Sequence, residues 1–227
     1  MIDKLYKALI EKDRYLAYLE GFKMTLLLSF LSVLLGAAIG LIIATIKYAA
    51  VRNKLLAVPN FICNAYIAVI RGTPVYVQML IIYFIIFNNR DTSPLLAGVV
   101  CFGINSSAYV AEIIRAGIEA VDAGQGEAGR SLGLSWMQTM IYIVMPQAIK
   151  NILPALGNEF IVLIKETAIA GNIAVLDVTK AATNIGVATY DYLPPLLIAA
   201  SIYFTVVMIL TKLLRSFERR LAKSDRR

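Results

Sequence analysis

The chain has 227 residues, of which 59% are hydrophobic and 16% are charged, with a net charge of +7 at pH 7. A soluble domain has about 25% charged residues, so this composition excludes an ordinary soluble fold. The chain has no histidine, and its two cysteines show no metal-ligand spacing, so neither imidazole chemistry nor a metal site is indicated. The basic residues lie beside apolar runs, which is typical of membrane flanks and not of nucleic-acid binding.

Five apolar segments are long enough to cross a bilayer, which requires about 20 helical residues. The first covers residues 24–46 and contains no charged residue. The others are 55–87, which is interrupted near 71–74, then 94–120, 146–164 and 193–214. Residues 167–190 are rich in small and polar residues, so we expect outward-side helices or a partly re-entrant piece there. The pattern predicts an all-α integral membrane protein that forms a single domain over residues 1–227.

The basic residues of the short loops predict the orientation of the chain. The loop after the first span carries Lys47, Arg52 and Lys54 and no acid, the loop at 88–91 is neutral, and the C-terminal tail is strongly basic. By the positive-inside rule, the first loop and the tail are cytoplasmic. Five spans then place the N-terminus outside and the polar loop at residues 122–136 on the cytoplasmic side.

That polar loop carries a spaced motif. Its residues Glu127-Ala128-Gly129 are followed after three residues by Gly133, and after nine more by Ile143-Val144-Met145-Pro146. The layout resembles the EAA loop of ABC-importer permeases, although Gly129 and Met145 stand where alanine and leucine are usual. In that family the loop forms a short cytoplasmic coupling helix that sits in a cleft of the ATPase subunit.

The resemblance implies that this coupling function falls to Gln125, Glu127, Ala128, Gly129, Ser131, Leu132 and Gly133. We expect Gly133 to suit a helix C-cap, and Leu132, Leu134 and Trp136 to supply apolar contact for a partner groove. From the residues alone, a loop that packs on its own bundle is the alternative.

Further stretches resemble the branch of these permeases that imports polar amino acids. They lie at residues 66–74, 108–115, 124–128, 158–161 and 165–167, and the resemblance covers about residues 21–220. It implies the type I importer fold, a dimer of identical or different permeases, and two copies of an ATP-binding subunit. It also implies an extracytoplasmic amino-acid-binding protein and a prokaryotic cytoplasmic membrane.

The chain itself lacks the glycine-rich lysine motif that cradles ATP phosphates. We therefore expect no enzyme activity and no cofactor on this chain, with ATP and Mg²⁺ bound by the partner subunit. An intramembrane enzyme and a carrier outside the ABC class are remote alternatives.

Several polar residues fall at one depth in the predicted bundle, where ionisable groups are costly and indicate function. Counting along the helices places Asn105 and Glu159 near the middle of the membrane, and Arg71 and Thr73 lie at the break in the second span. Such a break exposes backbone groups that transporters use for polar substrates. The candidate substrate site therefore comprises Arg71, Thr73, Asn105, Ser106, Asn158 and Glu159.

In this site Arg71 suits a substrate carboxylate, and Glu159 suits an ammonium or a cationic side chain. The alternative is that Arg71 and Glu159 pair with each other or with neighbours. Glu159 favours arginine, lysine or histidine as the substrate, with glutamine or another polar amino acid as the alternative. Glu112, Arg115 and Glu119 are spaced as a structural ladder on the third span.

Overall fold

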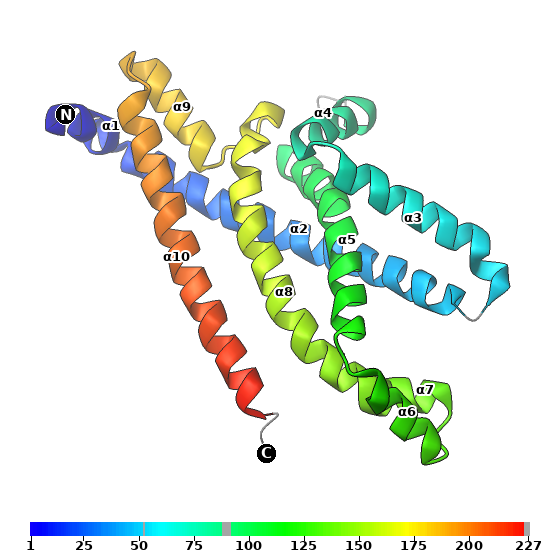
Figure 1. The fold of residues 1–227 in the computed structure, drawn as a ribbon. Helices are drawn as coiled ribbons and strands as arrows, with labels where there is room; N and C mark the ends of the chain where they lie inside the picture. The colour runs from blue at the N-terminus through cyan, green and yellow to red at the C-terminus, as the bar shows by residue number, and fades with distance from the viewer. Residues whose placement is uncertain (52, 88–91, 225–227) are drawn as a thin grey trace.

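The computed structural model describes residues 1–51, 53–87 and 92–224, and all the regular structure in these ranges is helical (Figure 1). Arg52, the 88–91 loop and the last three residues of the basic tail, which contributed to the charge argument, lie outside the described residues. The α-helices are α1 (Ile2–Leu9), α2 (Tyr15–Ala50), α3 (Ala57–Gly72), α4 (Val75–Ile86), α5 (Pro94–Glu119), α6 (Ala123–Ser131), α7 (Trp136–Thr139), α8 (Met145–Glu166), α9 (Val178–Thr189) and α10 (Leu193–Ser224). Short 3₁₀ segments lie at Glu11–Asp13, Lys54–Leu56 and Thr167–Ile173, and a π-helix lies at Met140–Val144.

Helices of membrane-spanning length lie at all five predicted positions. By length and composition, four segments among the described residues qualify as spans: Glu11–Ala50, Lys54–Gly72, Pro94–Glu119 and Leu193–Leu221. At predicted residues 146–164, α8 has 22 residues and so reaches about 33 Å, but its composition is less apolar. Its crossing of the membrane remains a prediction. Both α2 and α10 extend beyond the apolar runs that predicted them.

The predicted break in the second span is present and separates α3 from α4. Thr73 and Pro74 are both extended, with ψ of 152° and 132°. Proline disfavours helical backbone at the residue before it and cannot donate an N–H, so Pro74 ends α3 and allows α4 to begin in a new direction. The break thereby places the C-terminal end of α3 beside the middle of the bundle.

The centre of the bundle is α5, which packs against α2 and α8 (Figure 1). The contact with α2 is close because α2 presents glycines there. A Cβ added at Gly36 would lie 2.9 Å from Cβ of Ser106, and one at Gly40 would lie 2.8 Å from Cβ of Val110. Small residues spaced four apart allow helix backbones to approach closely in membranes. This contact fixes the depth of Ser106 and its neighbours on α5.

Candidate functional site

The coupling loop folds into the helix α6 and the single turn α7. The first backbone donors of α6 are capped by Asp122, whose Oδ1 accepts from the N–H of Gly124 at 2.6 Å. At its end, Gly133 has φ of +84° and donates to the carbonyl of Arg130, and Leu134 donates to the carbonyl of Gly129. This pair of bonds is a Schellman motif, in which glycine supplies the left-handed residue. The predicted helical turn and the C-cap at Gly133 are confirmed.

Close packing of α6 explains why glycine stands at position 129. Gly129 is buried, and a Cβ added there would lie 2.7 Å from Cδ1 of Ile143 and 2.9 Å from Cγ2 of Thr139. Such distances are well inside van der Waals contact, so α6 packs more closely on α7 and the π-helix than an alanine would allow in this arrangement. The departure from the usual EAA residue therefore accompanies a tightly packed coupling segment.

The aromatic residue of the loop packs on its own chain. A capping box between Ser135 and Gln138 begins α7, and Trp136 stacks on Tyr48 of α2 with ring centroids 5.3 Å apart. One face of the Trp136 ring is therefore covered by its own chain, and a contact of Trp136 with a partner stays a prediction. Leu132 is 82% exposed at the end of α6, so it is available for such a contact.

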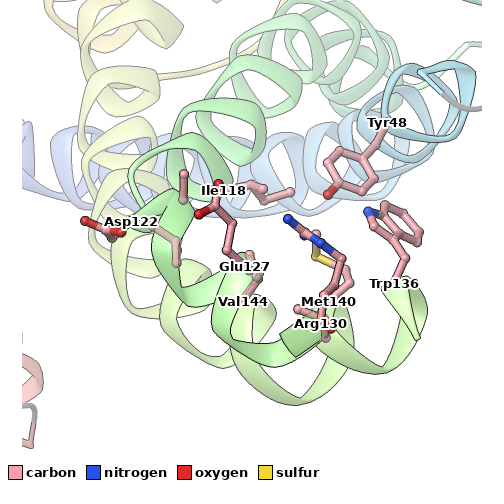
Figure 2. A pocket seen from close by; sticks show the side chains of 12 residues that line it. Tyr48, Ile118, Asp122, Glu127, Arg130, Trp136, Met140 and Val144 are labelled. Carbon is pink, nitrogen blue, oxygen red and sulfur yellow. The ribbon is translucent and has the colours of Figure 1, made fainter. Parts of the chain in front are cut away.

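The other coupling residues lie mainly on the outside of α6. Glu127, Ala128 and Ser131 are exposed, and Gln125 accepts a long hydrogen bond of 3.5 Å from Gln147. Between α6 and the neighbouring ends of α2 and α5 there is a pocket of about 260 Å³ (Figure 2). Figure 2 shows Glu127 extending toward Ile118 and Arg130 extending toward Tyr48. The segment thus presents one face to the surface and encloses a hollow behind it.

A buried carboxylate lies at the contact between α5 and α8. Glu159 is 8% exposed and accepts a hydrogen bond of 2.8 Å from the hydroxyl of Ser106. Among the residues that the structure describes, no lysine or arginine lies within ion-pairing distance of Glu159. The predicted neighbour Asn158 is exposed, and the hydrogen bond of this pair does not include it. The carboxylate therefore has one neutral donor and no counter-charge.

A second polar group closes the break between α3 and α4. The Nε2 of Gln78 donates to the carbonyl oxygens of Ile70 and Thr73 and to the Thr73 hydroxyl, and its Oε1 accepts from Nδ2 of Asn105 at 2.7 Å. Thr73 and Asn105, both predicted substrate residues, are thus joined through Gln78. Gln78 was not among the predicted site residues, although a lone amide inside the apolar run of α4 is a signal for a buried polar contact.

The third polar group surrounds Glu112 of α5. Its carboxylate lies 3.2 Å from Lys47, 3.5 Å from Arg71 and 2.9 Å from Arg115. Arg115 also reaches Glu119 at 2.5 Å, which confirms the predicted ladder. Arg71 thus pairs with Glu112 and not with Glu159 in this structure, and its contact with a substrate carboxylate stays a prediction. The guanidinium of Arg71 also lies over the ring of Tyr109, 5.5 Å from its centroid.

The family of binding-protein-dependent transport system inner membrane components matches residues 36–223. The chain is 41% identical to the arginine transport system permease protein ArtQ of Bacillus subtilis (strain 168), over 91% of this chain and 93% of ArtQ. It is 40% identical to the putative glutamine transport system permease protein GlnP of Rickettsia typhi (strain ATCC VR-144 / Wilmington), over 92% of this chain and 94% of GlnP.

A crystal structure of an amino acid ABC transporter with histidines is similar over 90% of this chain and 94% of the matched chain. The sequence identity is 49% and the TM-score is 0.83. These similarities confirm the all-helical architecture of a type I importer permease and the resemblance on which it was predicted. The chain therefore belongs to the family of binding-protein-dependent transport system inner membrane components, which are multi-pass transport permeases and not enzymes.

Proposed function

We propose that this chain forms the translocation pathway of an ATP-driven importer for a basic amino acid, namely arginine, lysine or histidine. The observation that carries this proposal is the carboxylate of Glu159, which is buried beside Ser106 with no basic partner in the described part of the chain. Ionised groups at membrane depth are costly and are otherwise paired, so this carboxylate lacks a cation. The ammonium or guanidinium of a basic substrate supplies that charge.

The relatives support this substrate class and also define its alternative. ArtQ is named for arginine transport, and the similar crystal structure contains histidines. GlnP is named for glutamine transport. Glutamine is neutral in its side chain, so it offers Glu159 only its α-ammonium or amide N–H groups. The lone carboxylate therefore favours a basic side chain over a neutral one.

The proposed assembly requires partners on both faces of the membrane. Two copies of an ATP-binding subunit hold ATP and Mg²⁺ and contact α6, while an extracytoplasmic protein delivers the amino acid. A second permease subunit, identical or different, completes the pathway. The N-terminus then lies outside, and the α6–α7 segment and the C-terminus lie in the cytoplasm, as the positive-inside rule indicates. Residues 1–227 form one transmembrane domain with five spans.

The substrate proposal is tested by ATP hydrolysis in the reconstituted complex with a panel of amino acids and the binding protein. We expect Glu159→Gln to reduce stimulation by arginine, lysine and histidine by about 10- to 100-fold, because a charge-assisted contact is lost. Glu119→Gln is the matched control, because it removes an exposed carboxylate of the same chain. Equal stimulation of wild type and Glu159→Gln at every arginine concentration would contradict the role of Glu159.

The coupling role of α6 is tested at its exposed leucine. We expect Leu132→Asp to weaken association with the ATP-binding subunit by about 10-fold, because it puts a charge into an apolar contact. Copurification from membranes measures that association. Leu176→Asp is the control, since Leu176 is also exposed (60%) but lies near α9. Stoichiometric copurification of the Leu132→Asp variant would show that α6 does not dock through this residue.

A further inference from the structure

A second carboxylate on α8 has no partner within the described part of the chain. Glu166 is the last residue of this helix and is partly buried. It makes no hydrogen bond or ion pair with any residue that the structure describes. A partly buried carboxylate of this kind loses water without gaining a protein contact, so it favours the binding of a cation.

Glu166 lies on the same side of α8 as Glu159. The two residues are seven positions apart in one α-helix, which corresponds to about two turns and about 10.5 Å along the helix axis. Their carboxylates are near enough to repel each other. Because like charges destabilise each other more strongly where water is partly excluded, a cation bound between these carboxylates stabilises both.

The packing at the end of α8 holds Glu166 in a fixed position. The next residue, Thr167, is fully buried, and its hydroxyl donates to the carbonyl of Ile164 at 3.0 Å. The same hydroxyl lies 3.5 Å from the hydroxyl of Ser29 on α2. The 3₁₀ segment Thr167–Ile173 packs against α2, α4, α5 and α9. Glu166 therefore stands on a rigid element, which suits a residue that must keep its distance from Glu159.

The basic residue beside Glu166 projects from another side of the helix. Lys165 is exposed, and adjacent residues of an α-helix diverge by about 100°. Its charge attracts the Glu166 carboxylate without forming an ion pair. Two carboxylates against one ammonium leave this stretch of α8 with an excess of negative charge. Arginine and lysine carry an excess of positive charge, whereas glutamine carries none.

The spacing of the two carboxylates matches the length of a basic amino acid. Arginine and lysine carry one positive charge at the α-carbon and a second at the end of the side chain, about 7 Å away when extended. A charge-assisted hydrogen bond adds about 2.8 Å at each end. The extended ligand therefore reaches carboxylates up to about 12 Å apart, which includes the spacing of about 10.5 Å along α8.

We propose that Glu166 is a specificity-determining residue that binds the α-ammonium of the substrate, while Glu159 binds the side-chain cation. The inference rests on the proposed function, which assigns the positive charge of a basic amino acid to Glu159. With Glu159 alone, the α-ammonium that every amino acid carries would satisfy that carboxylate. Because Glu166 takes the α-ammonium, only a cationic side chain satisfies Glu159. The pair of carboxylates thus selects basic amino acids over glutamine.

The proposal is tested by equilibrium binding of radiolabelled L-arginine to the complete transporter in nanodiscs, without the binding protein. Two analogues compete with arginine: citrulline has the same length and a neutral side chain, and Nα-acetylarginine keeps the guanidinium but has no α-ammonium. We expect Glu166→Gln to weaken the binding of arginine and citrulline by about 10-fold and to leave that of Nα-acetylarginine unchanged, because only the contact with the α-ammonium is lost. Glu159→Gln should weaken the binding of arginine and Nα-acetylarginine but not that of citrulline.

Two further variants make this test specific for the charge at position 166. Glu166→Asp retains the carboxylate, so we expect it to restore part of the affinity for arginine. Glu20→Gln is the matched control, because it removes an exposed carboxylate of α2 that has no ion pair among the described residues. Equal weakening of arginine and Nα-acetylarginine by Glu166→Gln, or an effect no larger than that of Glu20→Gln, overturns the proposal.

Failure of the proposed function gives a different result. If Glu159→Gln weakens citrulline as strongly as arginine, Glu159 does not bind the side-chain cation, and its role in the proposed function fails whatever the result at Glu166. A wild-type complex without saturable arginine binding contradicts the present inference, while ATP hydrolysis with the binding protein still decides the proposed function.

Discussion

Glu159 and Glu112 are both carboxylates inside the helical bundle, but they have opposite surroundings. Glu159 lies between α5 and α8 with a single neutral donor, the Ser106 hydroxyl. Glu112 lies farther along α5 and is contacted by Lys47, Arg71 and Arg115. Among the residues that the structure describes, Glu112 is neutralised by basic side chains and Glu159 has no charged partner.

This difference distinguishes polar groups that are paired within the protein from polar groups that are available to bind a ligand. A carboxylate surrounded by cations has its electrostatic requirement met before any substrate arrives, so it holds helices together. A carboxylate that lacks a cation at membrane depth is stabilised only by neutralisation or by a bound cation. Gln78 belongs with Glu112 in this respect, because its hydrogen bonds go to residues of the break and to Asn105. The comparison predicts that substitutions at these positions affect stability and transport differently.

The largest effect on stability is expected for Gln78→Leu. Leucine fits the apolar surroundings but leaves the amide of Asn105, the carbonyl of Ile70 and the hydroxyl of Thr73 without this partner. We expect a loss of about 3 kcal/mol, since each unpartnered buried group costs about 1–3 kcal/mol and membrane helices recover part of it. The melting temperature of the purified complex in detergent measures the loss.

The matched control for this substitution is Gln78→Glu, which keeps the shape and one acceptor but loses the amide donor. At a pH where the added carboxyl is neutral, we expect the melting temperature of Gln78→Glu to lie between those of wild type and Gln78→Leu. A Gln78→Leu variant as stable as wild type would show that the break is held by Pro74 and packing alone, and that Gln78 is not required.

The next effect compares the two carboxylates directly. Glu112→Gln leaves three basic side chains around a neutral amide, so we expect a loss of about 2 kcal/mol. Glu159→Gln removes a carboxylate that has no counter-charge, so we expect stability to change by less than about 1 kcal/mol or to rise. Thermal unfolding of both variants at one pH and salt concentration measures the contrast. Equal losses of stability in the two variants would contradict the distinction between Glu112 and Glu159.

The sequence alone predicted much of this fold and part of the site. Long apolar segments located the helices, and the Arg71-Gly72-Thr73-Pro74 stretch located the break, because apolar length and proline geometry are local properties. The spacing of the coupling motif predicted α6 and its glycine cap for the same reason. Counting residues also placed Asn105 and Glu159 at a common depth, and the structure joins Glu159 to Ser106, the residue next to Asn105, by a hydrogen bond.

Partners across helices were harder to predict, because they depend on how each helix is rotated about its axis. The sequence left open whether Arg71 faces Glu159 or another residue, and only the structure pairs it with Glu112. Gln78 was missed because nothing in its neighbourhood shows that its amide reaches back across the break. The stacking of Trp136 on Tyr48 joins residues that are distant in the chain and carry no shared motif. The pocket behind α6 follows from the same tertiary contacts.

The smallest effect is expected at the ion pair between Lys4 and Asp191, where the charges are matched but solvent-exposed. The Lys4 ammonium lies 2.8 Å from the Asp191 carboxylate, and its hydrogen bond holds the pKa of that carboxyl below the usual value. Because the folded-state pKa is lowered, the pair stabilises the fold above the ordinary aspartate pKa of about 3.9 and ceases to do so as the pH falls through the lowered value. Asp191→Asn should therefore melt slightly below wild type at pH 6, and this difference should disappear in strong acid and shrink in high salt. A difference that persisted at low pH would mean that Asp191 acts through its backbone environment and not through its charge.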